Sequence, residues 1–192
     1  MNKPYIFIAY GVSDCGKDTV ALLLDKFTPC QNIKFTECWK RAFETWLCIP
    51  EYSLDDKAFR VKQVVNTVTG KEEDYTYNDI MYRWYHQMEV IIPGSWMFAG
   101  YLASKLEDLV TSVCITDLRK PIEIDILNKL SDKYELVVLH IKGRGKAAST
   151  DGNLDVNKLN CTKVFTIDNS KSINLEELSS QVQYVVDSLG CG

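Results

Sequence analysis

The sequence is poor in the features that mark membrane, secreted and zinc-binding proteins. Its apolar runs fall well short of the ~20 residues that cross a bilayer, so no membrane span is expected. No basic segment followed by an apolar stretch stands at the N-terminus, so no secretory signal is expected either. Only two histidines occur, and the seven cysteines include no Cys-x-x-Cys pair, which argues against a zinc site.

An excess of positive charge is also missing. The chain has 22 lysines and arginines against 26 aspartates and glutamates, and its net charge of −4 argues against general nucleic-acid binding. The odd number of cysteines, in a sequence without a secretory signal, predicts free thiols in a reducing cytoplasm. These absences together indicate an ordinary cytoplasmic globular protein.

What the sequence does contain is enough apolar material for one α/β domain of 192 residues. Most of its short apolar segments lack polar alternation, which is typical of a parallel sheet covered on both faces. The expected strands are residues 5–10, 32–35, 112–116, 136–140 and 163–167.

Helical patterns separate these strands. The expected helices are 17–27, 37–47 after Thr36 as a cap, 77–88, 95–110, one opening at Pro121, and a last one from Asn174 with an apolar face of Leu175, Leu178, Val182, Val185, Val186 and Leu189. The alternation predicts a three-layer α/β fold, with a mostly parallel five-stranded sheet and helices on both faces. Residues 55–77 are polar and weakly periodic, so we expect a short helix and a loop there.

Directly after the first expected strand, residues 11–19 read Gly-Val-Ser-Asp-Cys-Gly-Lys-Asp-Thr. Gly11, Gly16 and Lys17 have the Gly-x-x-x-x-Gly-Lys spacing of a phosphate-binding loop. Glycine permits positive φ and a close approach of backbone to phosphate, and the N–H groups of residues 14–19 then form an anion-binding concavity. The N-terminus of the following helix adds its own N–H groups and dipole. The loop predicts binding of a nucleoside phosphate.

The residues around the lysine carry two open alternatives. Ser or Thr usually follows the lysine and holds Mg²⁺, but here Asp18 follows and Thr19 comes one residue later. Asp18 either holds magnesium through a water or only favours the first helical turn. Asp14 and Cys15 lie inside the loop. The thiol of Cys15 is either oxidisable, because helix N-termini lower thiol pKa, or simply small enough to fit.

A second polar group follows the strand expected at 112–116. Ligands in doubly wound sheets bind beyond the carboxyl ends of the strands, so Asp117 and Arg119 are expected near the phosphate loop. Asp117 either contributes to a magnesium site or caps a turn. Arg119 either clamps a phosphate bidentately or pairs with Glu123 one helical turn further on. We favour the phosphate-site role for both residues.

Five segments along the chain carry a family resemblance. They are Gly-Lys-Asp-Thr-Val-Ala at 16–21, residues 35–47 with Lys40-Arg41-Ala42, the helix with Trp96, Thr116-Asp117-Leu118-Arg119-Lys120-Pro121 with Glu123, and a closing part with 141–144, 165–169 and the last helix. In this order they resemble the phage-type deoxynucleoside monophosphate kinases, within the P-loop nucleoside and nucleotide kinases. The resemblance spans most of the chain, and only the phosphate loop is specific by itself.

The resemblance implies a single kinase domain over 1–192, in the cytoplasm, or in the host cytoplasm if the source is viral. Its activity would be transfer of the γ-phosphate of ATP to a deoxynucleoside monophosphate, with Mg²⁺ as cofactor, and a homodimer is compatible with it. In this hypothesis Lys17 neutralises the transferred group. Asp18, Thr19 and Asp117 organise Mg²⁺ and its waters.

The same hypothesis places the acceptor in the segment 36–95 and a lid at 142–160. Arg119 would clamp the acceptor phosphate, and Lys142 and Arg144 would close over the phosphates from the lid, excluding water. One of Lys40 and Arg41 would reach the acceptor phosphate, unless both lie on a solvated helix face.

One further cation is surrounded by aromatic residues. Arg83, beside Trp84 and Tyr85, either forms an acceptor pocket in which the base stacks on a ring, or belongs to an aromatic core or dimer surface. Trp96 is another candidate contact for the acceptor, with packing in the core as its alternative.

One stretch departs from the family. Its members carry Leu-Gln-x-x-Gly-Thr-Asp before the tryptophan helix, whereas residues 81–88 here read Met-Tyr-Arg-Trp-Tyr-His-Gln-Met. Two other functions therefore stay open. The fold serves another small phosphorylated acceptor, as in phosphomevalonate kinases, whose animal-type members share a similar Gly-Lys-Asp loop. Alternatively, the protein binds nucleotide without catalysis.

Overall fold

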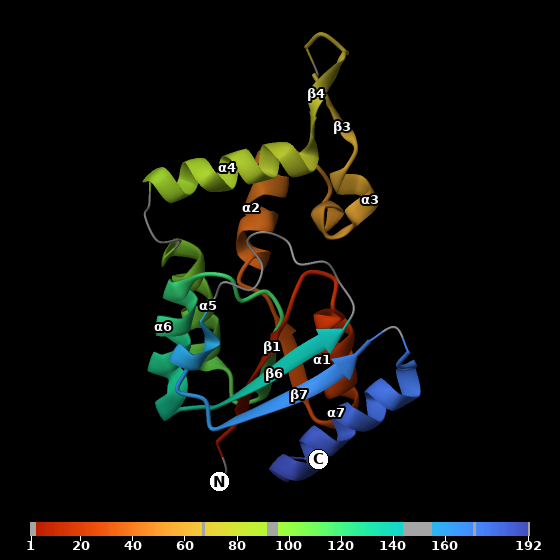
Figure 1. Cartoon of the computed structure of the whole chain (residues 1–192). Helices are drawn as coiled ribbons and strands as arrows, with labels where there is room; N and C mark the ends of the chain where they lie inside the picture. Colours follow the sequence, from red (N-terminus) through yellow and green to blue (C-terminus); the bar gives the residue numbers. More distant parts are fainter. Residues whose placement is uncertain (1–2, 67, 92–95, 144–154, 171, 192) are drawn as a thin grey trace. The chain divides into compact units, whose positions relative to one another are not determined.

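The computed structural model describes residues 3–66, 68–91, 96–143, 155–170 and 172–191. Its larger sheet has five strands in the order β2-β5-β1-β6-β7, and every neighbouring pair in it is parallel (Figure 1). Their bounds are β1 Tyr5–Tyr10, β2 Cys30–Ile33, β5 Ser112–Ile115, β6 Glu135–Gly143 and β7 Lys163–Asn169. This confirms the predicted parallel five-stranded sheet and puts β1, which leads into the phosphate loop, at its centre.

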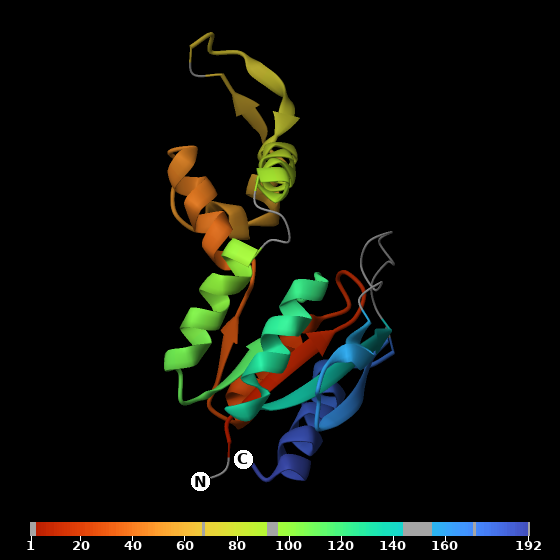
Figure 2. The same cartoon turned by 90° about the vertical axis from the view of Figure 1, so that its left-hand side faces the viewer.

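Helices cover both faces of this sheet. They are α1 Lys17–Phe27, α5 Trp96–Asp108, α6 Pro121–Lys129 and α7 Leu175–Leu189. Tyr5, Phe7 and Ala9 of β1 pack in one buried cluster with apolar side chains of α1 and α7. The opposite face of the sheet carries α6 and the end of α5 (Figure 2). Alternation along β1 turns Ile6 and Ile8 to that face, and both are fully buried. The continuous apolar run of β1 follows from burial on both faces.

Local signals explain where three of these helices begin. α1 starts at Lys17, directly after Gly16 in the left-handed region, and α6 starts at Pro121. α7 has a capping box, in which Asn174 accepts from the Glu177 N–H at 2.9 Å and Glu177 accepts from the Asn174 N–H at 3.0 Å. These starts confirm the sequence prediction. Leu175, however, is exposed rather than part of the buried face, because it opens the helix one turn before Leu178.

Two sequence predictions on strands need correction. β2 lies two residues earlier than expected and ends at Ile33, because the Phe35 N–H leaves the ladder and donates to Asp117 Oδ1 at 2.9 Å. The segment 55–77 contains a short helix, as predicted, but also an unpredicted antiparallel hairpin. The bounds are η1 Ser53–Asp55, α3 Lys57–Arg60, β3 Gln63–Val65 and β4 Glu72–Thr76. The hairpin residues are exposed or half-buried, so they show no apolar alternation.

The chain divides into two compact units. The first lies within Met1–Phe35 and Leu102–Gly192 and holds the five-stranded sheet, and the second is Thr36–Tyr101. The second unit contains α2 Glu37–Trp46, the hairpin and α4 Tyr77–Ile91, and Trp39, Phe43, Leu54 and Met81 form its core. The segment expected to bind the acceptor, 36–95, falls inside this unit. Among the described helices, none combines the length and the apolarity needed to cross a bilayer.

Candidate functional site

The phosphate loop joins the carboxyl end of β1 to α1, and two of its positions admit only glycine. Gly16 has a φ of +99°, and a Cβ built there would lie 2.3 Å from Asn169 Nδ2. Gly11 has a φ of +156°, and a Cβ there would lie 2.5 Å from the Ile141 carbonyl oxygen. Both the conformation and the close packing therefore exclude a side chain at these positions. This is the backbone freedom that the glycine spacing predicted.

Lys17 lies across the loop that precedes its own helix. Its Nζ donates to the carbonyl oxygens of Gly11 at 2.9 Å and Val12 at 2.8 Å. A cation held this way balances the partial negative charge of two carbonyl groups. A phosphate group entering the loop would compete with those carbonyls for the ammonium group, and it would form the stronger, charge-assisted bond.

Cys15 lies inside the loop with its side chain fully buried. Burial raises the pKa of its thiol, and this outweighs the charge of nearby Lys17, which lowers the pKa. Of the two alternatives drawn from the sequence, the structure therefore favours the small side chain that fits over the reactive thiolate. The backbone of Cys15 is held from β7, because Asn169 Nδ2 donates to its carbonyl oxygen at 2.7 Å. Sequence reasoning assigned no role to Asn169. Asp14, also in the loop, is exposed and has a φ of +59°.

Asp18, in the first turn of α1, is bound by two residues from the ends of neighbouring strands. Its Oδ1 accepts from Thr116 Oγ1 at 2.9 Å and lies 2.8 Å from Lys34 Nζ. Partial burial raises the pKa of this carboxyl group, but Lys34, Thr116 and Lys17 outweigh it and hold the pKa below its ordinary value. Thr19 is exposed on the same turn. No local sequence pattern marks Lys34 as a site residue, because its partner Asp18 lies in a different segment of the chain.

Asp117 is buried just beyond the end of β5. Its carboxylate accepts a hydrogen bond from the Phe35 N–H, just beyond the end of β2. Arg119 follows it and is exposed. The Glu123 carboxylate accepts from the backbone N–H groups of Arg119 at 2.6 Å and Lys120 at 2.8 Å. Glu123 therefore caps the start of α6, and the hydrogen bonds described for it come from backbone groups rather than from the Arg119 guanidinium.

The buried carboxyl group of Glu123 is expected to make the protein less stable as the pH rises from about 4.5 to about 7. Burial raises its pKa from 4.5 to about 7, against the two N–H groups that lower it. The unfolded chain therefore loses this proton first, and the free energy of unfolding falls by up to ~3 kcal/mol across the window. Urea unfolding at pH 4 to 8 measures this change in the free energy of unfolding.

The control variants are Glu123→Gln and Asp125→Asn, the second at an exposed position on the same helix. Glu123→Gln should remove most of the decrease in the free energy of unfolding with pH, whereas Asp125→Asn should retain it. Identical pH profiles for wild type and Glu123→Gln would contradict this account.

In the second unit, both cations proposed for the acceptor phosphate have acidic partners. Lys40 Nζ lies 3.0 Å from Asp55 Oδ1, and Arg41 binds both Asp55 and the buried Glu44. The Arg41 guanidinium also lies over the Tyr52 ring, 4.2 Å from its centroid. Burial raises the pKa of Asp55, but Lys40 and Arg41 outweigh this and lower it. An acceptor phosphate would have to displace these carboxylates.

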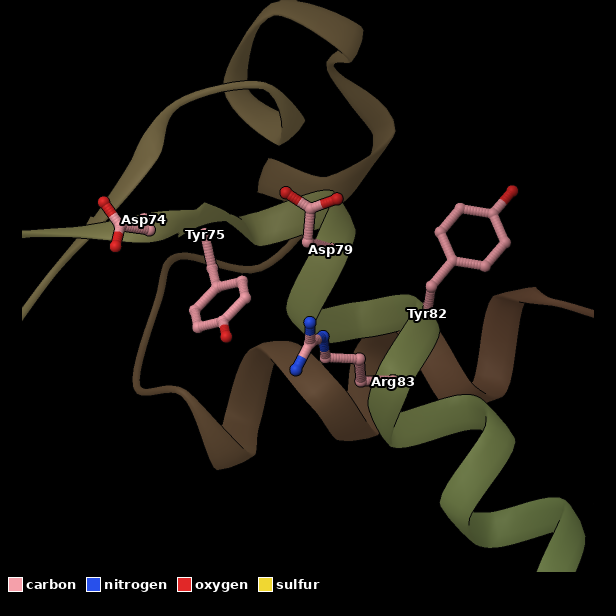
Figure 3. Close-up of a pocket in the computed structure, with 5 residues that line it drawn as sticks. All are labelled: Asp74, Tyr75, Asp79, Tyr82 and Arg83. Carbon is pink, nitrogen blue, oxygen red and sulfur yellow. The ribbon is translucent and has the colours of Figure 1, made fainter.

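Arg83 lines a pocket of about 460 Å³ in the same unit, although with different aromatic neighbours from those expected (Figure 3). Its guanidinium lies 4.3 Å from the centroid of the Tyr75 ring. Trp84 and Tyr85 instead contact Trp39 in the unit's core, with ring centroids 6.5 and 5.5 Å apart. The lining of the pocket is Asp74, Tyr75, Asp79, Tyr82 and Arg83. The core alternative is therefore correct for Trp84 and Tyr85.

The remaining predicted residues are only partly described. Lys142 is exposed near the end of β6, in register with Asp168 of β7, so the expected lid begins as a strand. Arg144 and the side chain of Trp96 lie outside the described residues. Residues 155–160 contain the short helix η4 Val156–Lys158.

The oxygen ligands at the start of α1 fit magnesium better than a transition metal. Mg²⁺ keeps several waters and takes one or two carboxylates together with substrate phosphates. Asp18 and Thr19 offer exposed oxygen atoms beside the phosphate loop. In the described part of the chain, no three His, Cys, Asp or Glu side chains gather as metal ligands. A site completed by nucleotide phosphates and water matches these residues.

No protein-family model matches the sequence, and no curated protein matches it significantly. A structure of a candidate kinase from Chloroflexus aurantiacus is similar over 100% of this chain and 99% of its own, with 12% identity and a TM-score of 0.55. The chain has the fold of the P-loop kinases. At this identity the likeness establishes the fold alone.

Two other solved structures also align over nearly the whole chain. A gluconokinase from Sinorhizobium meliloti covers 98% of this chain and 95% of its own, with 12% identity and a TM-score of 0.47. A thymidylate kinase from Candida albicans covers 98% and 93%, with 13% identity and a TM-score of 0.45.

Proposed function

We propose that the protein is a kinase that transfers the γ-phosphate of ATP to a deoxynucleoside monophosphate. The phosphate loop carries this proposal. Gly11 and Gly16 occupy positions where no side chain fits, and Lys17 places its ammonium group across the loop at the end of the central strand. This combination serves phosphate binding at the carboxyl edge of a parallel sheet.

Phosphoryl transfer requires the protein to align donor and acceptor and to neutralise the charge of the phosphates, and it requires no covalent bond to the protein. In this proposal the N–H groups of residues 14–19 hold the donor β-phosphate and Lys17 stabilises charge on the transferred group. Asp18, Thr19 and Asp117 hold magnesium and its waters, and bound magnesium neutralises phosphate charge. Arg119 binds the acceptor phosphate, with Lys142 and Arg144 covering the site.

The choice of acceptor rests on the resemblance of the sequence to deoxynucleoside monophosphate kinases. The second unit, Thr36–Tyr101, is proposed to bind it, through one of Lys40 and Arg41 and through Arg83 and Trp96. The base would meet the Arg83 pocket, where Tyr75 and Tyr82 supply aromatic surface.

A second candidate function is nucleotide binding without phosphoryl transfer. The ion pairs of Lys40 and Arg41 favour it, because Asp55 and Glu44 neutralise the charges of both cations. In this alternative the phosphate loop keeps its ligand while the second unit takes no acceptor.

An acceptor panel separates these functions. ADP formation from ATP and Mg²⁺ is measured with each of the four deoxynucleoside monophosphates, the ribonucleoside monophosphates and phosphomevalonate, against a Lys17→Ala background. We expect turnover with at least one deoxynucleoside monophosphate that disappears in the variant. Turnover with phosphomevalonate alone would reassign the acceptor. ATP binding without turnover on any acceptor would establish the non-catalytic alternative.

A further inference from the structure

The acidic residue after the phosphate-loop lysine is bound by two neighbouring strands. β2 and β5 pair in parallel as far as Ile33 and Ile115. Lys34 and Thr116 each follow that last pair by one residue, so their side chains emerge together at the carboxyl edge of the sheet. Both reach Asp18 Oδ1, Lys34 Nζ at 2.8 Å and Thr116 Oγ1 at 2.9 Å.

This arrangement does little for stability. The Asp18 side chain is 67% exposed and that of Lys34 is 34% exposed, and ion pairs in such positions contribute little to folding because water screens them. Its effect is on geometry. An exposed aspartate in a first helical turn samples several rotamers, whereas two donors on one oxygen atom select one of them. Among the described contacts of Asp18, both fall on Oδ1, which leaves Oδ2 to face a further ligand.

We propose that Lys34 is a positioning residue for the magnesium-bound nucleotide, acting through Asp18. This role of Lys34 rests on the proposed function only because it requires that the phosphate loop bind ATP. Phosphate loops commonly offer a hydroxyl group directly after the lysine, on a short side chain with little freedom. Here the longer carboxylate of Asp18 stands at that position, and Lys34 with Thr116 restricts it. Thr116 contacts the same oxygen atom of Asp18 without carrying a charge. Substitutions of Lys34 and Thr116 therefore distinguish an effect on the orientation of Asp18 from an effect of charge.

An alternative role for Lys34 predicts the opposite change in the preference for magnesium-bound ATP. If Lys34 merely competed with the cation for the carboxylate, its removal would strengthen the preference for magnesium-bound ATP. If Lys34 positions the carboxylate, its removal weakens that preference. Asp18 is the common route in the positioning case, so Lys34 and Asp18 substitutions should not add.

The test measures the dissociation constant of ATP by calorimetry with Mg²⁺ and again with EDTA, and takes the ratio. Wild type should bind the magnesium complex more tightly. Lys34→Met and the charge-neutral Thr116→Val should each reduce this ratio about threefold to tenfold, and Lys34→Arg should restore most of it. Asp18→Asn should reduce the ratio at least as much as Lys34→Met does, and adding Lys34→Met to Asp18→Asn should change the ratio no further.

Each other outcome overturns the proposal. A larger ratio in Lys34→Met would establish competition, and an unchanged ratio would make the ion pair incidental. Full additivity with Asp18→Asn would show that Lys34 acts elsewhere. The measurement is independent of acceptor turnover. A wild type that binds ATP but phosphorylates nothing defeats the kinase proposal alone, whereas one that binds no ATP in either condition defeats both.

Discussion

Lys17→Ala is expected to lower the rate of phosphoryl transfer on the order of a thousandfold while the protein stays folded. The ammonium group is the cation that the phosphate loop itself supplies, and loss of a transition-state cation in such sites costs about this much. The folded state loses the hydrogen bonds of the ammonium group to the Gly11 and Val12 carbonyls and its longer contact with Cys15 Sγ at 4.0 Å, and water can take the place of the ammonium group in this part-buried loop. Steady-state turnover measures the first effect, and circular dichroism with thermal unfolding measures the second.

A matched control lies on the same helix. Lys26 is an exposed lysine in the last turn of α1, with its Nζ 5.6 Å from the centroid of the Phe27 ring. Lys26→Ala removes the same charge and a similar side chain at the far end of the helix, so turnover should stay near wild type. Near-normal turnover in folded Lys17→Ala would refute the chemistry assigned to the loop.

Gly16→Ala is expected to abolish measurable nucleotide binding and to destabilise the protein. The position has a φ of +99°, which costs a residue with a Cβ about 1–3 kcal/mol. The new methyl group would also lie 2.3 Å from Asn169 Nδ2, which is held in place by its bond to the Cys15 carbonyl oxygen. Relief of this overlap either turns the Asn169 amide away and breaks its bond to the Cys15 carbonyl oxygen, or moves the loop, and both changes disturb the N–H groups that would face a phosphate. Calorimetric titration with ATP and urea unfolding measure the two effects.

Gly70→Ala separates backbone strain from crowding. Gly70 also has a positive φ, +67°, but a Cβ there meets nothing within 4 Å. Its substitution should cost about 1 kcal/mol of stability and leave ATP affinity unchanged, because the residue lies in the hairpin loop of the other unit. Equal ATP affinity in Gly16→Ala and wild type would show that this glycine does not shape the binding loop.

The parts of the fold that the sequence predicted are those whose causes lie within a few consecutive residues. The apolar run of β1, the glycines and lysine of the loop, Pro121 and the Asn174 capping box are each readable in one short segment, and all stand where they were expected. The five-stranded sheet followed from the alternation of such segments. The hairpin at β3 and β4 was missed because strands without a buried face leave no apolar period.

The partners of the site residues were decided by the tertiary structure. Lys34 meets Asp18 because β2 and β5 are neighbours, and Asn169 meets Cys15 although the two are 154 positions apart in the chain. Strand order and the packing of separate segments determine such contacts, and neither is encoded in local periodicity. The sequence by itself therefore determined which residues form the phosphate loop and the class of fold that carries it. Only the tertiary structure decided which side chains bind Asp18 and Lys40 and which backbone N–H binds Asp117, because hydrogen bonds and ion pairs form between atoms that folding brings within about 3 Å.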